Sequence, residues 1–472
     1  MSTPLREAGR AHGQPGAAPA AERPDYGSAT GGRLRLPVTW PLVVLFVAFP
    51  LWWVLGVGSF TWSIVPIFMV VAMIWRQRTR APVAFALWLA FVSWVLLSGL
   101  QLVSGTKIIT FSYRLTLYAG AGVLFLYVYN LPRSGRLDSK VLRILTIFWM
   151  VVVIGGYLGI LVGAHTFTPP LEYLLPHGLR SQPFVQELVR PVFAEVENFL
   201  GYPVPRPAAP FPYTNNWGGT IAALTPVAFA AMSAAGPGPR RKVIAGFLVA
   251  SLVPMIVSLN RGMFLSLGIG LVYVAVRLAI RGRLGVLVSM LSVVAVLAIV
   301  VAMTPLGHLV TANLTSTHGR SNQTRASVEQ QAIAGTNQSP IFGYGEPQAV
   351  TGQGATPPIG TQGQLWMTLY SNGYPATLFF IGFILAVLWQ TRRARGTAGL
   401  WLHTVPLIAL TQIVVYGWLP IEIQVVMAAA ALAYRRCWRP ASAVAPGPGA
   451  ALADGPDVAS LSPQPAFPAV AR

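Results

Sequence analysis

The sequence predicts an all-α fold, a polytopic membrane bundle of about twelve transmembrane helices. Three observations support this prediction. Of the 472 residues, 54% are hydrophobic and only 10% are charged, whereas a soluble domain carries about 25% charged residues. Apolar runs of about 20 residues, the length that crosses a bilayer core, recur along most of the chain. Basic residues gather in every second connection between these runs, as the positive-inside rule requires.

The apolar runs define the expected helices in chain order. The first two are joined only by residues 56–59, which indicates a tight helical hairpin, and the last two meet near Pro420. The twelve expected spans are 37–57, 59–75, 82–103, 111–131, 141–163, 215–235, 243–260, 262–280, 284–303, 364–390, 398–418 and 420–435.

Basic residues predict the sidedness of these helices. The N-terminal segment and every second connection after it hold 25 of the 33 Lys and Arg residues, and the opposite side holds 8. We therefore expect both termini in the cytoplasm. The formal net charge of +20 is then a topology signal, and nucleic acid is not an expected partner.

The chain divides into a membrane domain and two tails. Residues 1–36 and 436–472 are rich in Pro, Ala and Gly, and we expect disordered cytoplasmic tails because such segments cannot bury a core. Residues 37–435 form the predicted transmembrane domain, whose first helix should act as an uncleaved anchor. Two long extracytoplasmic loops, 164–214 and 304–363, interrupt it, and long loops in compact proteins are often functional.

The first long loop is predicted to contain an amphipathic helix. Apolar residues recur at helical spacing over 181–200, so we expect a helix on the outer membrane surface that either serves a site or merely caps the bundle. Prolines 205, 207, 210 and 212 stiffen the segment after it. They hold Arg206 near the outer end of the sixth helix.

Other external segments also present Arg residues. Arg261 lies in a tight turn between two apolar helices, where it either snorkels to the interface or contributes to a site. The second long loop contains Arg320 and Arg325, then a short helical stretch, and then Gly-Tyr-Gly at 343–345. Those three residues could form a turn whose backbone N–H groups bind an anion.

These segments, in this order and topology, resemble the bacterial O-antigen ligase and O-antigen polymerase superfamily. In that family an Arg precedes a Gly/Pro/Asn-rich approach to a span, as Arg206 precedes Asn215-Asn216 here. A Ser-Arg-Gly-type turn opens a later helix, and Asn260-Arg261-Gly262 is similar. The family's large loop has an Arg, a helix and Pro-x-x-Gly-x-Gly, which Arg325 and residues 340–345 match. The resemblance covers roughly residues 37–435, with motifs in the second half only.

The resemblance implies a membrane glycosyltransferase-type polymerase or ligase of the bacterial cytoplasmic membrane. Such an enzyme moves a glycan from polyprenyl diphosphate to a saccharide or lipid acceptor at the outer face, in the biosynthesis of cell-envelope polysaccharide. One departure matters. Ligases of the family usually carry a His just before the span that follows the large loop, and residues 360–366 contain none. This departure favours a polymerase or a divergent relative over a ligase.

The expected catalytic residues are Arg206, Arg261 and Arg325, converging on the donor diphosphate. Breaking the anomeric C–O bond leaves negative charge on the diphosphate, and Arg suits that charge because it stays cationic and binds phosphate oxygens bidentately. The expected substrate-binding residues are Arg320, Arg114, Asn216 and Glu346.

The acceptor hydroxyl should attack the anomeric carbon with inversion, as the resemblance implies. Glu346 and Glu195 are candidates for the base that removes its proton. The predicted exterior contains no Asp, so we expect neither a metal nor another cofactor. Two other functions stay open: a twelve-span transporter or lipid-linked glycan flippase, which should show internal repeats, broken helices and midplane polar groups, and a non-catalytic membrane scaffold.

Overall fold

The computed structural model describes residues 37–76, 79–102, 105, 107–197, 203–285, 288, 318–348 and 358–437, and for residues 183 and 318–325 it describes the backbone alone. From Val38 onward these residues form one unit that is mostly helical, which confirms the all-α class. The predicted tail 1–36 and most of the predicted tail 436–472 lie outside the described residues.

The elements alternate between long helices and short connecting pieces. They are α1 (Trp40–Leu42), the π-helix η1 (Val43–Val47), α2 (Phe49–Leu55), α3 (Gly58–Trp75), α4 (Phe85–Ser98), the 3₁₀-helix η2 (Gly99–Gln101), α5 (Lys107–Tyr129), α6 (Gly135–Val162), α7 (Pro170–Leu174), α8 (His177–Arg180), α9 (Pro183–Val189), β1 (Ala194–Glu197), β2 (Val204–Pro207), α10 (Thr214–Ala234), α11 (Pro239–Val257), α12 (Arg261–Ala279), α15 (His318–Gln338), α16 (Gln364–Thr391), α17 (Gly396–Gln412) and α18 (Glu422–Arg435).

Six of these helices are long and apolar enough to cross a membrane, namely α3, α5, α6, α10, α12 and α16. Helix α11 has 19 residues but is not among the six. The remaining predicted spans contain shorter helices, and most of the predicted span 284–303 lies outside the described residues. The expected number of twelve spans stays a prediction. Two outer helices have apolar outward faces: Val249 and Leu252 on α11 and Leu265 and Val272 on α12 are 47% to 69% exposed. Exposed apolar faces of this kind suit lipid hydrocarbon better than water.

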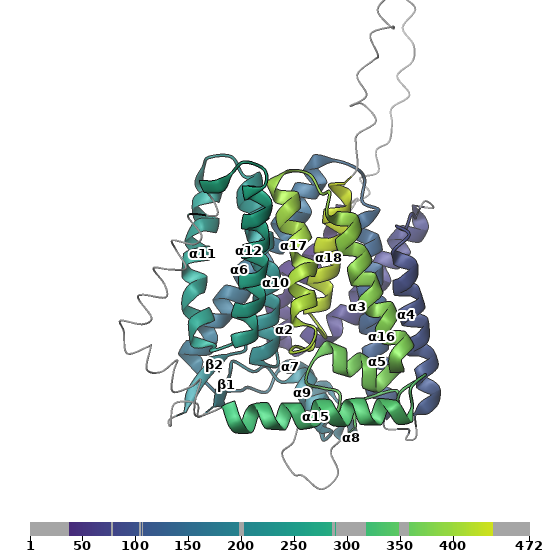
Figure 1. The fold of residues 1–472 in the computed structure, drawn as a ribbon. Coiled ribbons are helices and arrows are strands. Elements are labelled where there is room, and N and C mark those ends of the chain that lie inside the picture. Colours follow the sequence, from purple (N-terminus) through teal and green to yellow (C-terminus); the bar gives the residue numbers. More distant parts are fainter. Residues whose placement is uncertain are drawn as a thin grey trace, which may run out of the picture. The chain divides into compact units, whose positions relative to one another are not determined.

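The two ends of the bundle differ in chemistry (Figure 1). One end carries α7, α8, α9, α15 and both strands, and we call it the loop end. We call the other end the basic end. Its connections, with the first turns of α6 and α11, contain Arg76, Arg80, Arg133, Arg136, Lys140, Arg240, Arg241, Lys242, Arg281, Arg283, Arg392, Arg393 and Arg395.

Helix α18 forms the centre of the bundle. Every residue from Glu422 to Arg435 is buried, and the helix packs against α5, α10, α16 and α17. At the basic end, Arg435 Nε donates to Oδ1 of Asp138 at 2.6 Å, and its guanidinium also donates to the carbonyls of Leu131 at 2.6 Å and Pro132 at 2.9 Å. In the sequence, Arg435 is one of the basic residues that predict a cytoplasmic side. In the structure it also binds α18 to the α5–α6 connection.

Helix α16 is broken at Gly373, whose φ of 76° and ψ of −178° are not helical. The turn formed by residues 340–345 packs into this break. A Cβ atom at position 373 would lie within 2.7 Å of the carbonyl groups of Pro340 and Ile341, so both space and conformation require glycine. Three backbone hydrogen bonds join the turn to the break: Tyr344 N to Tyr370 O at 3.1 Å, Gly345 N to Ser371 O at 2.8 Å and Tyr374 N to Pro340 O at 2.9 Å.

The prediction of an anion-binding turn at 343–345 is therefore wrong. All three backbone N–H groups donate to carbonyl oxygens, those of Ser339, Tyr370 and Ser371. The two glycines have φ values of 62° and 75°, which non-glycine residues rarely adopt. Gly343 allows close packing against α16, and Gly345 allows close packing against Ser98 and Leu102.

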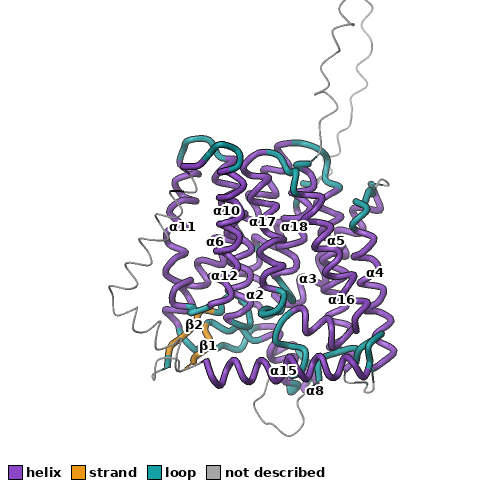
Figure 2. The backbone as a smooth tube through the Cα atoms, viewed as in Figure 1, coloured by secondary structure: helices purple, strands orange, loops and turns teal. Residues whose placement is uncertain are grey.

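The prediction of one amphipathic helix over 181–200 is also wrong. Helix α9 ends at Val189, and residues 194–197 form β1, which pairs antiparallel with β2 so that Glu195 lies opposite Arg206. Figure 2 shows the strand pair in orange at the loop end. Pro191 cannot donate a backbone hydrogen bond and disrupts a helix. The partner strand β2 was not predicted, because it contains two prolines and prolines are rare within sheets.

Glycines on α6 let the strand pair approach the helix backbone. A Cβ at Gly159 would lie 2.5 Å from Phe193 O and 2.8 Å from Cα of Pro207, and a Cβ at Gly155 would lie 2.7 Å from Cδ of Pro210. The segment that carries Arg206 is thus seated directly on α6.

We predict that Gly155→Ala destabilises the protein by about 1–3 kcal/mol, because the added methyl group overpacks this contact. Gly268→Ala on α12 is the matched control, since a Cβ there meets nothing within 4 Å, and it should be neutral or slightly stabilising because Ala favours helix. Thermal unfolding in detergent measures both. Equal midpoints for the two variants would contradict the close approach.

Candidate functional site

Arg206 lies in β2 and is buried at the loop end. Its Nη1 donates to Oε1 of Glu197 at 2.5 Å, and its Nε donates to the backbone oxygen of Ser258 at 2.8 Å. Glu197 belongs to β1, so the pairing of the two strands sets up the ion pair. Ser258 follows the last residue of α11. Arg206 therefore connects the strand pair to the turn that precedes α12.

Arg261 is the first residue of α12, and its side chain is exposed. The residue before it, Asn260, is buried: its Nδ2 donates to Thr214 O at 3.3 Å, and its Oδ1 accepts from the hydroxyl of Tyr416. Leu259 in the same turn has φ 49°, a left-handed conformation that is rare for such a residue and is more often retained where function needs it. The structure thus brings together the segments of two predicted catalytic residues, Arg206 and Arg261.

The third predicted catalytic residue, Arg325, lies in α15 together with Arg320. The helix begins at His318, earlier than the sequence predicts, so both residues lie within it and do not precede it. Their side chains lie outside the described part of the chain. Helix α15 runs along the loop end, the same end as Arg206 and Arg261 (Figure 1).

Glu346 lies against α5, the helix that also contains Arg114, and both residues are predicted to bind substrate. Nζ of Lys107 lies 3.6 Å from Oε1 of the buried Glu346, the hydroxyl of Thr110 donates to its Oε2, and Arg114 attracts it electrostatically. Nη1 of Arg114 is buried without a hydrogen-bond partner among the described residues. The spacing of Lys107, Thr110 and Arg114 on one helix face could have predicted this cluster.

Asn216 and Glu195 make structural contacts near the start of α10. Nδ2 of Asn216 donates to the carbonyls of Gly417 at 3.1 Å and Leu419 at 3.3 Å. Oε2 of Glu195 accepts from the backbone N–H of Thr214 at 2.8 Å, the first residue of the helix. A carboxylate at this position stabilises a helix N-terminus. Both side chains therefore have an architectural role in the structure.

Glu422 is a residue that the sequence reasoning passed over. It is 1% exposed, and neither carboxyl oxygen has a hydrogen-bond partner among the described residues. A Cβ at Gly219 would collide with its carboxyl group, and a Cβ at the neighbouring Gly218 would collide with Asn260. Unpaired buried polar groups need an explanation, and ionisable residues inside membrane spans often mark function. The sequence feature that could have drawn attention to Glu422 is its position as an acidic residue within the predicted span 420–435.

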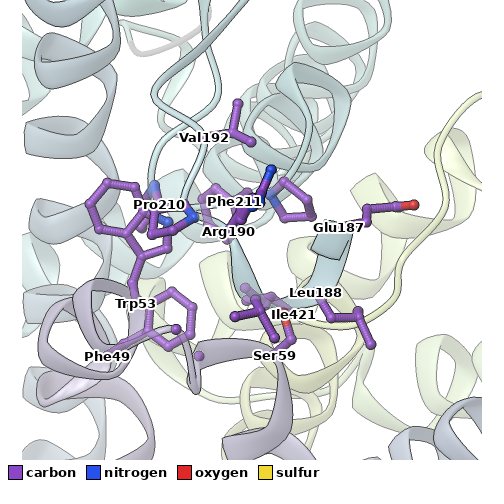
Figure 3. Close-up of a pocket in the computed structure, with 15 residues that line it drawn as sticks. Phe49, Trp53, Ser59, Glu187, Leu188, Arg190, Val192, Pro210, Phe211 and Ile421 are labelled. Atoms are coloured by element: carbon purple, nitrogen blue, oxygen red, sulfur yellow. The ribbon is translucent and has the colours of Figure 1, made fainter. Parts of the chain in front are cut away.

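A small pocket lies at the loop end between α2, α9 and residues 210–212 (Figure 3). Phe49, Trp53 and Phe211 form its aromatic side, and Arg190 and Glu187 also line it. Its volume of about 20 Å³ holds roughly one water molecule. This pocket is too small for a sugar or a diphosphate.

Around the pocket, ion pairs hold the short helices of the first long loop together. Glu172 on α7 is buried and accepts from Nη2 of Arg190 at 2.7 Å and from Nε of Arg180 at 3.3 Å. The hydrogen bond from Arg190, with the charges of both guanidinium groups, lowers the pKa of the Glu172 carboxyl below its ordinary value. Glu187 accepts from the hydroxyl of Tyr213, which precedes α10.

Among the described residues, no three His, Cys, Asp or Glu side chains lie in a group that could hold a metal ion. The expectation of metal independence stays a prediction. No protein-family model matches the chain, and a comparison with curated proteins finds no match. The resemblance to the O-antigen ligase and polymerase superfamily thus depends on the sequence motifs alone.

We predict that Arg206→Ala destabilises the protein more than Glu197→Ala. Arg206 is 8% exposed and its loss leaves Ser258 O without this donor, whereas Glu197 is 42% exposed and is solvated when unpaired. A buried group left without its hydrogen bond costs about 1–3 kcal/mol, and an exposed ion pair contributes about 1 kcal/mol or less. Thermal unfolding in detergent tests the order. Equal losses would mean that Arg206 does not secure the turn.

We predict a pH-dependent contribution from Glu172. Because its pKa is lower in the folded protein, its stabilisation is complete above the unfolded value of about 4.3 and is lost as the pH falls through the lower folded value. Glu172→Gln should therefore unfold a few degrees below wild type at pH 7, and this difference in unfolding temperature should narrow below about pH 4. A difference that stays constant from pH 7 to pH 3 would rule out this linkage.

Proposed function

We propose that this protein is a membrane glycosyltransferase-type polymerase or ligase, which moves a glycan from polyprenyl diphosphate to a saccharide or lipid acceptor at the outer face of a bacterial cytoplasmic membrane. In this proposal the loop end faces outward and the basic end faces the cytoplasm, as the distribution of Arg and Lys favours. The acceptor can be a growing saccharide or a lipid-linked glycan.

One observation carries the proposal. Arg206 is hydrogen-bonded to the turn that places Arg261 at the start of α12, and α15, which contains Arg325, lies at the same end of the bundle. Three separate parts of the sequence that contain these Arg residues thus lie at the end of the bundle where, in this proposal, a lipid-linked diphosphate presents its charge. A scaffold without chemistry gives no reason for this arrangement.

The surface of α12 offers a path for the lipid of the donor. Arg261 opens the helix, and Phe264, Leu265 and Val272 after it are exposed and apolar. From Arg261 to Val272 the helix rises by about 16 Å, roughly the depth of one leaflet of a 30 Å bilayer core. A polyprenyl chain along this face would hold its diphosphate beside Arg261.

The chemistry follows from these positions. The acceptor oxygen attacks the anomeric carbon, the C–O bond to the diphosphate breaks, and the electron pair stays on the diphosphate. Arg261 and Arg325 stabilise that charge, while Arg206 positions the turn. The acceptor proton passes to a base, for which Glu346 and Glu195 stay the two candidates. Glu195 also caps α10, and Glu346 is also paired with Lys107 and Thr110. Arg114 and Lys107 beside Glu346 complete a second positive region.

Turnover by purified protein in proteoliposomes, supplied with a polyprenyl-diphosphate oligosaccharide, tests the proposal. We predict that wild type lengthens or transfers the glycan and releases polyprenyl diphosphate. Arg261→Ala and Arg325→Ala should each lower the rate about 10²- to 10³-fold, the loss expected when one donor to a developing anion is removed. Arg206→Lys should retain the fold and lower the rate less.

Arg281→Ala is the matched control, because Arg281 follows the opposite end of α12 and is exposed at the basic end. It should retain full activity. Full activity of Arg261→Ala and Arg325→Ala alike would refute the proposed site. If wild type releases no polyprenyl diphosphate with any acceptor supplied, the proposed reaction is refuted.

A transporter or lipid-linked glycan flippase is the second candidate, and the break in α16 at Gly373 favours it, since broken helices are typical of transporters. The same proteoliposomes separate the two functions. A flippase moves a fluorescent lipid-linked oligosaccharide between leaflets and leaves its glycosyl diphosphate bond intact, whereas a polymerase or ligase cleaves that bond.

A further inference from the structure

A groove at the basic end lies between η1 and the first half of α6. Its volume is about 640 Å³, far above the pocket at the loop end. The groove combines two kinds of lining. Arg136, Lys140 and Arg143 line one part, and apolar side chains from both elements line another.

The three cations form a ladder along α6. Positions 136, 140 and 143 lie four and three residues apart, so they share one face of the helix. Arg136 and Arg143 are separated by an axial rise of about 10 Å. Arg240 at the start of α11 lies close enough to Arg143 for the two charges to repel. This face therefore gathers positive charge that a soluble anion or an anionic surface would neutralise.

Within the described residues, none of these four cations forms an ion pair with a carboxylate. The acidic residue on the same part of α6, Asp138, is bonded to Arg435. Like charges this close are unfavourable without a counter-charge. An anionic partner is the simplest way to offset their repulsion.

The apolar part of the groove follows the three cations along α6, toward the middle of the bundle. Ile144 and Ile147 follow Arg143 on α6, and Val43 and Val47 face them from η1. Position 147 lies about 16 Å along the helix from Arg136, the depth of one leaflet. η1 is a π-helix, closed by the bond from Ala48 N to Val43 O at 3.0 Å, and π-helical turns are wider than α-helical ones and frequent at functional sites.

We propose that this groove binds an anionic phospholipid of the inner leaflet, with its phosphate against Arg136, Lys140 and Arg143 and one acyl chain along Val43, Val47, Ile144 and Ile147. Basic pockets between transmembrane helices on the cytoplasmic side recognise anionic head groups in this way. The site rests on the membrane architecture and is independent of the reaction at the loop end. A phospholipid is favoured over free phosphate because four of the nine lining residues have apolar side chains, which contribute nothing to binding of a free anion.

Native mass spectrometry of the delipidated full-length protein, titrated with phosphatidylglycerol, tests the site. Wild type should bind phosphatidylglycerol at least about tenfold more tightly than phosphatidylcholine, since each cation near an anionic head group contributes substantially. The double variant K140Q/R143Q should lose that preference. The matched double variant R281Q/R283Q, which removes two exposed cations elsewhere at the basic end, should keep it.

Two further measurements keep the outcome interpretable. Ile147→Trp fills the apolar part of the groove without changing its charge and should also weaken phosphatidylglycerol binding. Millimolar inorganic phosphate should not displace the lipid. Equal binding of the two lipids by wild type, equal losses in the two double variants, or displacement by inorganic phosphate would each overturn the proposal.

Discussion

The break in α16 is the constraint on which the loop end depends. Backbone N–H and C=O groups freed inside an apolar bundle have no water to bind, so each must find a partner in the protein. The turn at 340–345 supplies those partners through three hydrogen bonds. It also packs directly against the backbone of Gly373, at a position with no room for a side chain. The same turn ends α15 and places Glu346 against α5. One backbone requirement thus fixes the position of a long surface helix and of a buried carboxylate.

Glycines extend this principle to the other half of the loop end. Gly155 and Gly159 let the strand segment with Arg206 lie on α6, while Gly218 and Gly219 give room to Asn260 and Glu422 on two sides of α10. Close approach of backbones is how helices in membranes pack without a hydrophobic driving force. Here it also aligns polar groups from β2, the α11–α12 turn and α18, so packing and the candidate site have the same origin.

Much of the helical framework could be predicted from the sequence, because apolar runs and basic connections reflect local properties of the chain. The boundaries of α3, α10 and α16 agree with the expected spans within a few residues. The strand pair could not be predicted, since β1 depends on a proline-rich partner and its own apolar spacing also suits a helix. The Gly-Tyr-Gly turn was misjudged because the N–H groups of Tyr344 and Gly345 donate to the carbonyls of Tyr370 and Ser371, each 26 positions later in the chain. Of the candidate site, the proximity of Arg206 to the turn before Arg261 was expected. Glu422 and Lys107 were not expected, and their contacts drew attention to them.

The burial of α18 has a consequence for how the protein is made. This helix is the last of the described helices to leave the ribosome, yet its neighbours α5, α10, α16 and α17 surround it on every side. Helices synthesised earlier therefore lack their central partner until α18 has been made. Insertion of α18 would then be the event that locks the bundle, with Arg435 docking on the α5–α6 connection as the final step.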